Sequence, residues 1–106
     1  MILLLTSKQR AFLRSTANGI DSILHIGKGE ISPAMIKQAD DALTAREIFK
    51  GKTLESCVLT PREAAETIAT QVNAEVVQVI GRSFVLFRRN KKEPKILLPG
   101  DKIRAK

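Results

Sequence analysis

Three segments of the chain carry apolar residues at the three- and four-residue spacing of one helix face. These residues are Leu13 and Ala17 in the first segment, Ile36, Ala39 and Leu43 in the second, and Ala65, Ile68 and Val72 in the third. The pattern predicts helices over residues 7–17, from 33 to about 47, and from 61 to about 73.

The residues that precede these segments are typical of helix starts. Thr6 is followed three residues later by Gln9, and Thr60 by Glu63, which is the spacing of a capping box. Ser32 is a suitable cap for the second helix, and a proline follows both Ser32 and Thr60 at the first helical position. At the other end of the first helix, Asn18-Gly19 predicts a left-handed C-terminal cap.

Four short segments rich in β-branched and aromatic residues lie between and after the helices. Residues 22–26, 48–54, 75–80 and 83–89 are predicted strands, of which 48–54 is weakened by Gly51. Only Gly81-Arg82 separates the last two. A two-residue loop with glycine first favours a hairpin with a type II′ turn.

The resulting element order, α-β-α-β-α-β-β, indicates an α/β fold. We expect a two-layer sandwich in which one mixed sheet of about four strands has three helices packed on it. A chain of 106 residues is one domain. Residues 1–99 are assigned to that domain, and residues 100–106 to a basic, flexible C-terminal tail.

The net charge of the chain is concentrated in its last quarter. Residues 82–106 carry nine basic and two acidic side chains, so they account for the whole formal charge of +7, and residues 1–81 sum to zero. A concentrated basic region on a small domain is typical of a protein that binds a polyanion, most often nucleic acid. The alternative is a solubilising tail with no partner.

The residues that support catalysis or metal binding are scarce. There is one histidine, His25, within a predicted strand, and one cysteine, Cys57, so neither an intramolecular disulfide nor a zinc site of several cysteines can form. Asp40 and Asp41 are adjacent on a helix and point about 100° apart, so they form no carboxylate pair and are expected to be solvated. We expect no enzyme activity, no metal site and no cofactor.

The four phenylalanines do not form a base-stacking surface. Phe84 and Phe87 lie three residues apart on one predicted strand and therefore point to opposite faces. We expect Phe12, Phe49, Phe84 and Phe87 to lie mainly in the core.

The turn Gly27-Lys28-Gly29-Glu30 is a more specific candidate site. It follows a predicted strand and precedes the helix that Ser32 caps. Its glycines allow close backbone approach and positive φ, a helix N-terminus favours phosphate, and Lys28 adds a cation. The alternative is an ordinary tight connection without a ligand.

Several stretches together resemble the CRM domain, named for chloroplast RNA splicing and ribosome maturation, and especially its single-domain bacterial members of the YhbY type. The matching stretches are Thr6-Ser-Lys-Gln-Arg, Ile26-Gly-Lys-Gly leading into Ile31-Ser, Leu43-x-x-Arg-Glu-Ile, and Val77-Gln-Val-Ile-Gly-Arg-Ser-Phe-Val-Leu-Phe-Arg. The resemblance implies an RNA-binding protein whose fold is similar to the C-terminal domain of translation initiation factor three. The family's G-x-x-G loop falls on residues 27–30, where Glu30 stands in place of the last glycine.

The residues and the resemblance together predict a non-catalytic protein that binds structured ribosomal RNA in precursors of the large (50S) ribosomal subunit during assembly. The alternative is a protein-interaction module that docks on a ribosomal protein or an assembly factor. The N-terminal apolar run is too short for a signal peptide or a membrane span, so we expect a cytoplasmic protein with no membrane partner. The resemblance implies a bacterial protein. A monomer is expected, with pairing of the outer strands between chains as the alternative. The predicted RNA-binding residues are Lys8, Arg10, Arg14, Gly27, Lys28, Gly29, Lys37, Arg88, Arg89, Lys91 and Lys92.

Overall fold

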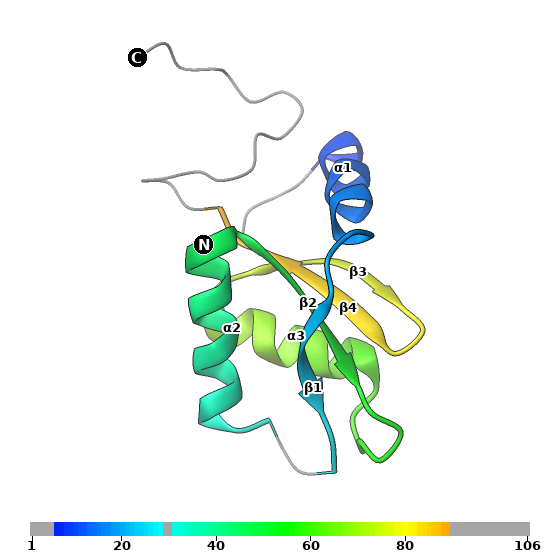
Figure 1. The fold of residues 1–106 in the computed structure, drawn as a ribbon, viewed down its shortest axis with the longest axis vertical. Coiled ribbons are helices and arrows are strands. Elements are labelled where there is room, and N and C mark those ends of the chain that lie inside the picture. Colours follow the sequence, from blue (N-terminus) through cyan, green and yellow to red (C-terminus); the bar gives the residue numbers. More distant parts are fainter. Residues whose placement is uncertain (1–5, 29–30, 90–106) are drawn as a thin grey trace.

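The computed structural model describes residues 6–28 and 31–89. Its elements follow the predicted order (Figure 1): α1 (Ser7–Ala17), β1 (Ser22–Ile26), α2 (Pro33–Arg46), β2 (Ile48–Thr53), α3 (Pro61–Val72), β3 (Glu75–Ile80) and β4 (Ser83–Phe87). The last strand ends two residues earlier than predicted, and β2 one residue earlier. The expected C-terminal tail, residues 100–106, lies outside the described residues.

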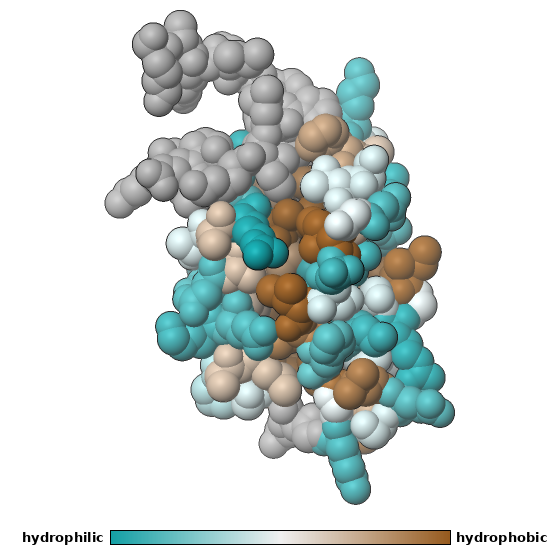
Figure 2. Space-filling model, viewed as in Figure 1, coloured by the Kyte–Doolittle hydropathy of each residue, from teal (hydrophilic) through white to brown (hydrophobic). Residues whose placement is uncertain are grey.

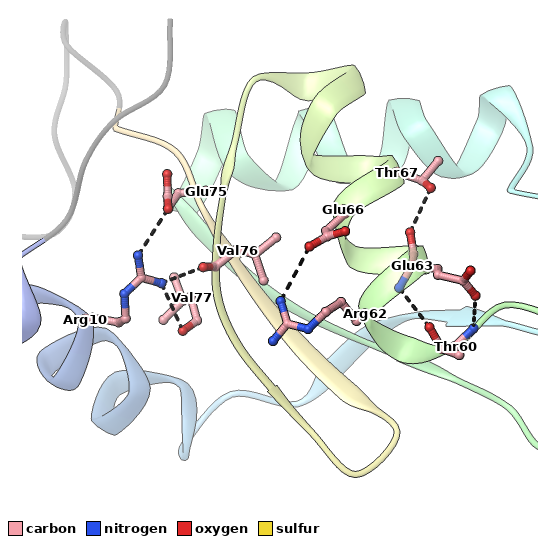
Figure 3. A network of polar contacts seen from close by, with 9 residues as sticks. All are labelled: Arg10, Thr60, Arg62, Glu63, Glu66, Thr67, Glu75, Val76 and Val77. Atoms are coloured by element: carbon pink, nitrogen blue, oxygen red, sulfur yellow. Dashed lines mark hydrogen bonds and ion pairs between the residues drawn. The ribbon is translucent and has the colours of Figure 1, made fainter.

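Side-chain caps fix the starts of the helices as the sequence predicts. Thr6 and Thr60 each form a complete capping box, with Gln9 and Glu63 respectively, and Figure 3 shows the Thr60–Glu63 pair. Ser32 accepts a hydrogen bond from the backbone N–H of Met35 at the start of α2. The predicted left-handed cap of α1 is wrong, because Asn18 is right-handed with φ −60°. Left-handed caps end α2 and α3 instead, at Glu47 and Asn73.

The four strands form one mixed sheet in the order β1-β2-β4-β3. β1 runs parallel to β2, and the other two neighbouring pairs are antiparallel. Gly81 has φ 59° in the β3–β4 hairpin, and Arg82 has no positive φ, as a type II′ turn requires. The predicted fold class, a mixed four-stranded sheet with three helices, is confirmed.

The helices lie on both faces of the sheet, as Figure 1 shows, with α1 on one side and α2 and α3 on the other. The predicted two-layer arrangement therefore holds for the sheet with α2 and α3, and α1 adds a partial third layer. The reason is visible in β4, where Phe84 and Leu86 face one cluster of buried residues while Val85 and Phe87 face the other. Because both faces of this strand are apolar, each needs a helix to exclude water.

The larger core lies between the sheet and the helices α2 and α3. Gly51 makes room in it for Phe84, because a Cβ at position 51 would lie 2.6 Å from the Phe84 ring. The ring packs edge-on against Phe49, with centroids 6.4 Å apart. Phe49, Phe84 and Phe87 are buried as expected, but Phe12 is 39% exposed, so its assignment to the core is wrong.

Strand β1 forms one edge of the sheet. Figure 2 has the same viewpoint as Figure 1, and on the side turned to the reader it shows hydrophobic residues in the middle with hydrophilic residues around them. The side-chain amide of Gln38 on α2 donates a hydrogen bond of 2.9 Å to the carbonyl oxygen of Ile23 in β1. This contact occupies a backbone acceptor of β1, the edge strand, which makes its pairing with another chain less favourable.

In the part of the chain that the structure describes, no helix is long and apolar enough to cross a membrane.

Candidate nucleic-acid interface

The sheet has two ends with different arrangements of charge. At one end β2 begins, β3 begins and β4 ends; we call it the clamped end, after the bonds made there by Arg10 and Arg88. At the other end, β1 and β2 finish and the β3–β4 hairpin turns; this open end carries Lys28, Lys52 and Arg82. The register fixes this arrangement, since Ile48 pairs with Phe87 while Lys52 pairs with both His25 and Ser83.

Arg88 holds three elements together at the clamped end. Its guanidinium donates to Asp40 Oδ1 (2.7 Å), to the Asp40 carbonyl (3.1 Å) and to Thr44 Oγ1 (2.9 Å), all on α2. It also donates to the carbonyl of Val72, the last residue of α3, at 2.8 Å. The helix-end carbonyl thus gains a partner. The side chain of Asp40 is 52% exposed, in line with its expected solvation, and it also forms an ion pair with Arg88.

Arg10 makes an equivalent connection from α1 (Figure 3). One of its guanidinium nitrogens donates to the carbonyls of Val76 (2.6 Å) and Val77 (3.3 Å), and the other pairs with Glu75 Oε2 at 3.1 Å. Arg10 therefore attaches α1 to β3. The donors of Arg10 and Arg88 that the sequence assigned to RNA are used within the fold.

The other two predicted cations of α1 also lie away from the glycine turn. Lys8 is exposed and Arg14 is half-buried. Their helix packs on β3 and on the start of β2 through Leu13 and Ala17, at the clamped end. The basic face of α1 therefore does not flank Gly27 and Lys28, because these two residues follow the far end of β1.

At the open end, Lys28 is exposed in the connection between β1 and α2. Gly27 beside it has no positive φ, and a Cβ there would make ordinary contacts with Leu54 (3.6 Å) and Ser56 (3.9 Å). The loop after β2 therefore supports the turn, and Leu54 N–H donates to the carbonyl of Ile26 at 2.8 Å. Gly29 and Glu30 lie outside the described residues.

Lys37 lies on α2, one turn after its N-terminal residue, Pro33. It is exposed and forms an i,i+4 ion pair with Asp41 at 3.4 Å. Such an exposed pair contributes about 0.3–0.5 kcal/mol, so its lysine can exchange this partner for a phosphate at small cost.

Two of the four C-terminal candidates, Arg88 and Arg89, belong to the described part of the chain. The guanidinium of Arg89 lies 5.9 Å from the centroid of the Phe87 ring, a cation–π distance. Lys91 and Lys92 lie outside the described residues, so their assignment stays a prediction.

Three cations that the sequence analysis did not select lie at or near the open end. Lys50 and Lys52 alternate with Gly51 on β2, and Arg82 lies in the hairpin turn. The two-residue spacing of the lysines was the available signal, since it places them on one face of a strand. In the described part of the chain, their side chains have no hydrogen-bond or ion-pair partner.

Groups suited to catalysis do not come together. Among residues 6–28 and 31–89, no three His, Cys, Asp or Glu side chains could hold a metal ion. His25 is exposed on β1, and Cys57 is half-buried in the loop before α3. What the arrangement offers chemically is a set of cations at one end of the sheet, of which Lys28 and Arg82 are exposed and Lys50 and Lys52 are half-buried.

The comparison with protein families decides the assignment. Residues 5–88 match the model of the CRS1/YhbY (CRM) domain. The chain belongs to the CRM domain family. The predicted resemblance is thereby confirmed over most of its extent.

Relatives within the CRM family support this assignment. The chain is 38% identical over 96 residues to YqeI of Bacillus subtilis, named a probable RNA-binding protein, covering 91% of this chain and all of that protein. It is 36% identical over 86 residues to a probable RNA-binding protein of Methanocaldococcus jannaschii, covering 79% of this chain and 63% of that protein.

A solved structure shows the same fold. It is the solution structure of a hypothetical protein from Staphylococcus aureus, described as a candidate RNA-binding protein. The two chains are 45% identical with a TM-score of 0.74, and the match covers 91% of this chain and all of the other.

Proposed function

We propose that this CRM protein is a non-catalytic RNA-binding protein. Its ligand is structured ribosomal RNA in precursors of the large ribosomal subunit, and it acts in the cytoplasm during subunit assembly. Family membership and the names of the relatives support RNA as the partner. The observation that carries the proposal is the placement of Lys28, which is exposed at the open end beside the connection into α2.

The proposed contacts read phosphate more than base identity. Lys28 precedes the start of α2 and Lys37 lies one turn into it, and a helix N-terminus favours an anion. Phe49, Phe84 and Phe87 are buried and so cannot stack on bases, and the exposed Phe12 lies on α1, away from the open end. RNA recognition by shape and by phosphate contacts is therefore the mode that this surface suits.

The role of each predicted residue follows from its existing bonds. Lys28 and Lys37 contribute charge directly. Arg10 and Arg88 act indirectly, since they hold α1, α2 and α3 in place around the sheet. Lys8, Arg14, Arg89, Lys91 and Lys92 would widen the basic surface beyond the open end.

Sedimentation of the native protein with cell lysate through a sucrose gradient tests the proposal. We expect co-migration with precursors of the large subunit at low salt, and loss of co-migration as salt rises. If the protein stays at the top of the gradient even at low salt, the ribosomal assignment fails. Co-migration that survives nuclease treatment and high salt would instead favour docking on a protein partner.

The salt dependence gives a quantitative check with purified RNA. If about six phosphates are neutralised, the logarithm of the affinity should fall against the logarithm of salt concentration with a slope near −5. A slope near zero would contradict the electrostatic basis. Turnover of RNA by pure, nuclease-free protein would contradict the non-catalytic assignment.

A further inference from the structure

The face of the sheet that carries α1 is covered over only part of its length. Under Leu13 and Ala17 of α1 lie Ile48, Val77, Val85 and Phe87, all buried. Ile48 begins β2 and Phe87 ends β4, so α1 covers the clamped end. Towards the open end, this face has no helix over it in the described part of the chain.

The strand register shows which side chains occupy the uncovered part of this face. His25, Lys52, Ser83 and Ile80 form one row across all four strands, because each is paired with its neighbour in the register. One step nearer α1, Lys50 pairs with Val85, which in turn pairs with Gln78. We call these six residues the uncovered sheet face: His25, Lys50, Lys52, Gln78, Ile80 and Ser83.

The direction of these side chains follows from their buried neighbours. Leu24 and Ile26 belong to the core under α2 and α3, so His25 between them points to the other face. On β2, Phe49 belongs to that same core and Gly51 faces Phe84 within it. Lys50 and Lys52 therefore point to the uncovered side.

The charge on this face is unbalanced. The four strands contain one carboxylate, Glu75, and it is paired with Arg10 at the clamped end. Lys50, Lys52 and the adjacent hairpin residue Arg82 have no ion pair among the described residues. Lys50 and Lys52 are half-buried and lie about 6.6 Å apart along the strand, so their positive charges repel each other.

We propose that the uncovered sheet face is a second RNA-contact surface, which holds the phosphate backbone through Lys50 and Lys52. The proposal rests on the proposed function and extends it. The surface is continuous with the open end, since Lys28 follows two residues after Ile26 and Arg82 lies next to Ser83. One RNA backbone can therefore pass from Lys28 onto the sheet.

The composition of the face favours RNA over a protein partner. Ile80, 64% exposed, is its one large exposed hydrophobic residue, and it has no aromatic residue. Protein interfaces usually have an apolar or aromatic centre. Two lysines with polar His25, Ser83 and Gln78 suit phosphate and sugar groups, and give little selectivity for base identity.

The test compares two double variants that each remove two positive charges. Lys50→Gln with Lys52→Gln alters the uncovered sheet face. Arg46→Gln with Arg62→Gln is the control with the same change of charge, because both arginines are exposed on the helices that cover the opposite face. Arg62 also loses an exposed i,i+4 ion pair with Glu66 (3.5 Å), which costs about 0.3–0.5 kcal/mol of stability. Binding to a labelled RNA hairpin is measured by fluorescence anisotropy across a salt series, with the wild-type protein and Lys28→Gln alongside.

We expect the lysine double variant to bind about tenfold more weakly at low salt, as the loss of two lysine–phosphate ion pairs predicts. Its salt slope should become shallower by about two. Lys50→Arg with Lys52→Arg should restore most of the binding, because the charge is kept. The thermal unfolding midpoint of all variants should stay near that of the wild type.

The possible failures are distinguishable. If the wild type does not bind the hairpin, the proposed function fails and this inference falls with it. If the wild type binds and Lys28→Gln weakens binding, but the lysine double variant behaves like the arginine control, the uncovered sheet face is not a contact surface. The inference is then overturned while the proposed function stands.

Discussion

The two ends of the sheet use positive charge in opposite ways. At the clamped end, Arg88 and Arg10 direct their guanidinium groups inward, to carboxylates and to backbone carbonyls. At the open end, Lys28, Lys52 and Arg82 have no such partner among the described residues. The difference shows that counting cations along the sequence is not enough to locate a binding surface. A cationic side chain that already bonds within the fold is not available to a ligand, so the internal bonds of each cation must be known first.

The largest expected effect is the loss of stability when an internally bonded arginine at the clamped end is removed. Arg88→Ala should lower the free energy of unfolding by about 3 kcal/mol, because charge-assisted hydrogen bonds are lost and the Val72 carbonyl is left unsatisfied. Urea denaturation measures the change. Arg82→Ala, the same substitution at the open end, should change stability by less than about 0.5 kcal/mol. Equal losses for the two variants would contradict the division of the sheet into two ends.

Two glycines give the same contrast at a smaller magnitude. Gly51→Ala should cost about 2 kcal/mol, because its Cβ would meet the buried ring of Phe84 at 2.6 Å. Gly27→Ala at the open end should leave the free energy of unfolding unchanged or slightly higher, because φ is compatible and the new contacts are ordinary. Thermal unfolding of both variants checks this. A strongly destabilised Gly27→Ala would mean that the turn is under conformational constraint.

The attachment of α1 should be weaker than the bonds of Arg88. Arg10→Ala should cost about 1.5 kcal/mol, since Arg10 is about one-third exposed and its ion pair with Glu75 is partly screened. Arg10→Lys should recover little, because an ammonium cannot reproduce the forked contacts with Val76 and Glu75. A double-mutant cycle with Glu75→Gln isolates the pair. A coupling energy near zero would mean that Arg10 stabilises the fold only through its hydrogen bonds to the backbone carbonyls of Val76 and Val77.

The smallest expected effects concern RNA affinity at single positions. Lys28→Gln should make the salt slope shallower by about one, as expected for one lost phosphate contact. Lys8→Gln, at the clamped end, should change the slope less. Anisotropy titrations with the same RNA hairpin measure both. A larger effect for Lys8 than for Lys28 would move the main contact surface onto α1.

Much of the local structure was predictable because its causes lie within a few residues. Capping boxes at Thr6 and Thr60 fix helix starts through bonds across three positions. Gly81 permits the hairpin because its own φ is positive. The wrong prediction at Asn18 shows the limit of such arguments. α1 ends there at a right-handed residue whose backbone N–H donates to the carbonyls of both Arg14 and Ser15.

The candidate site was less predictable because the ion pairs that occupy its cations join residues far apart in the sequence. Arg88 reaches Asp40 across 48 positions, and Arg10 reaches Glu75 across 65. No local pattern distinguishes these arginines from the unpaired cations. The alternation of Lys50 and Lys52 indicated a common face, but whether a helix covers that face depends on where α1 packs.

The sequence by itself determined the element order, the helix starts, the hairpin and the family, because these follow from local hydrogen bonding and from motifs within single elements. The tertiary structure alone decided that α1 lies opposite α2 and α3, and that the predicted cations separate into two ends. The physical reason is that burial of both faces of β4 places the helices. Strand register then places each charge either against an internal partner or toward solvent.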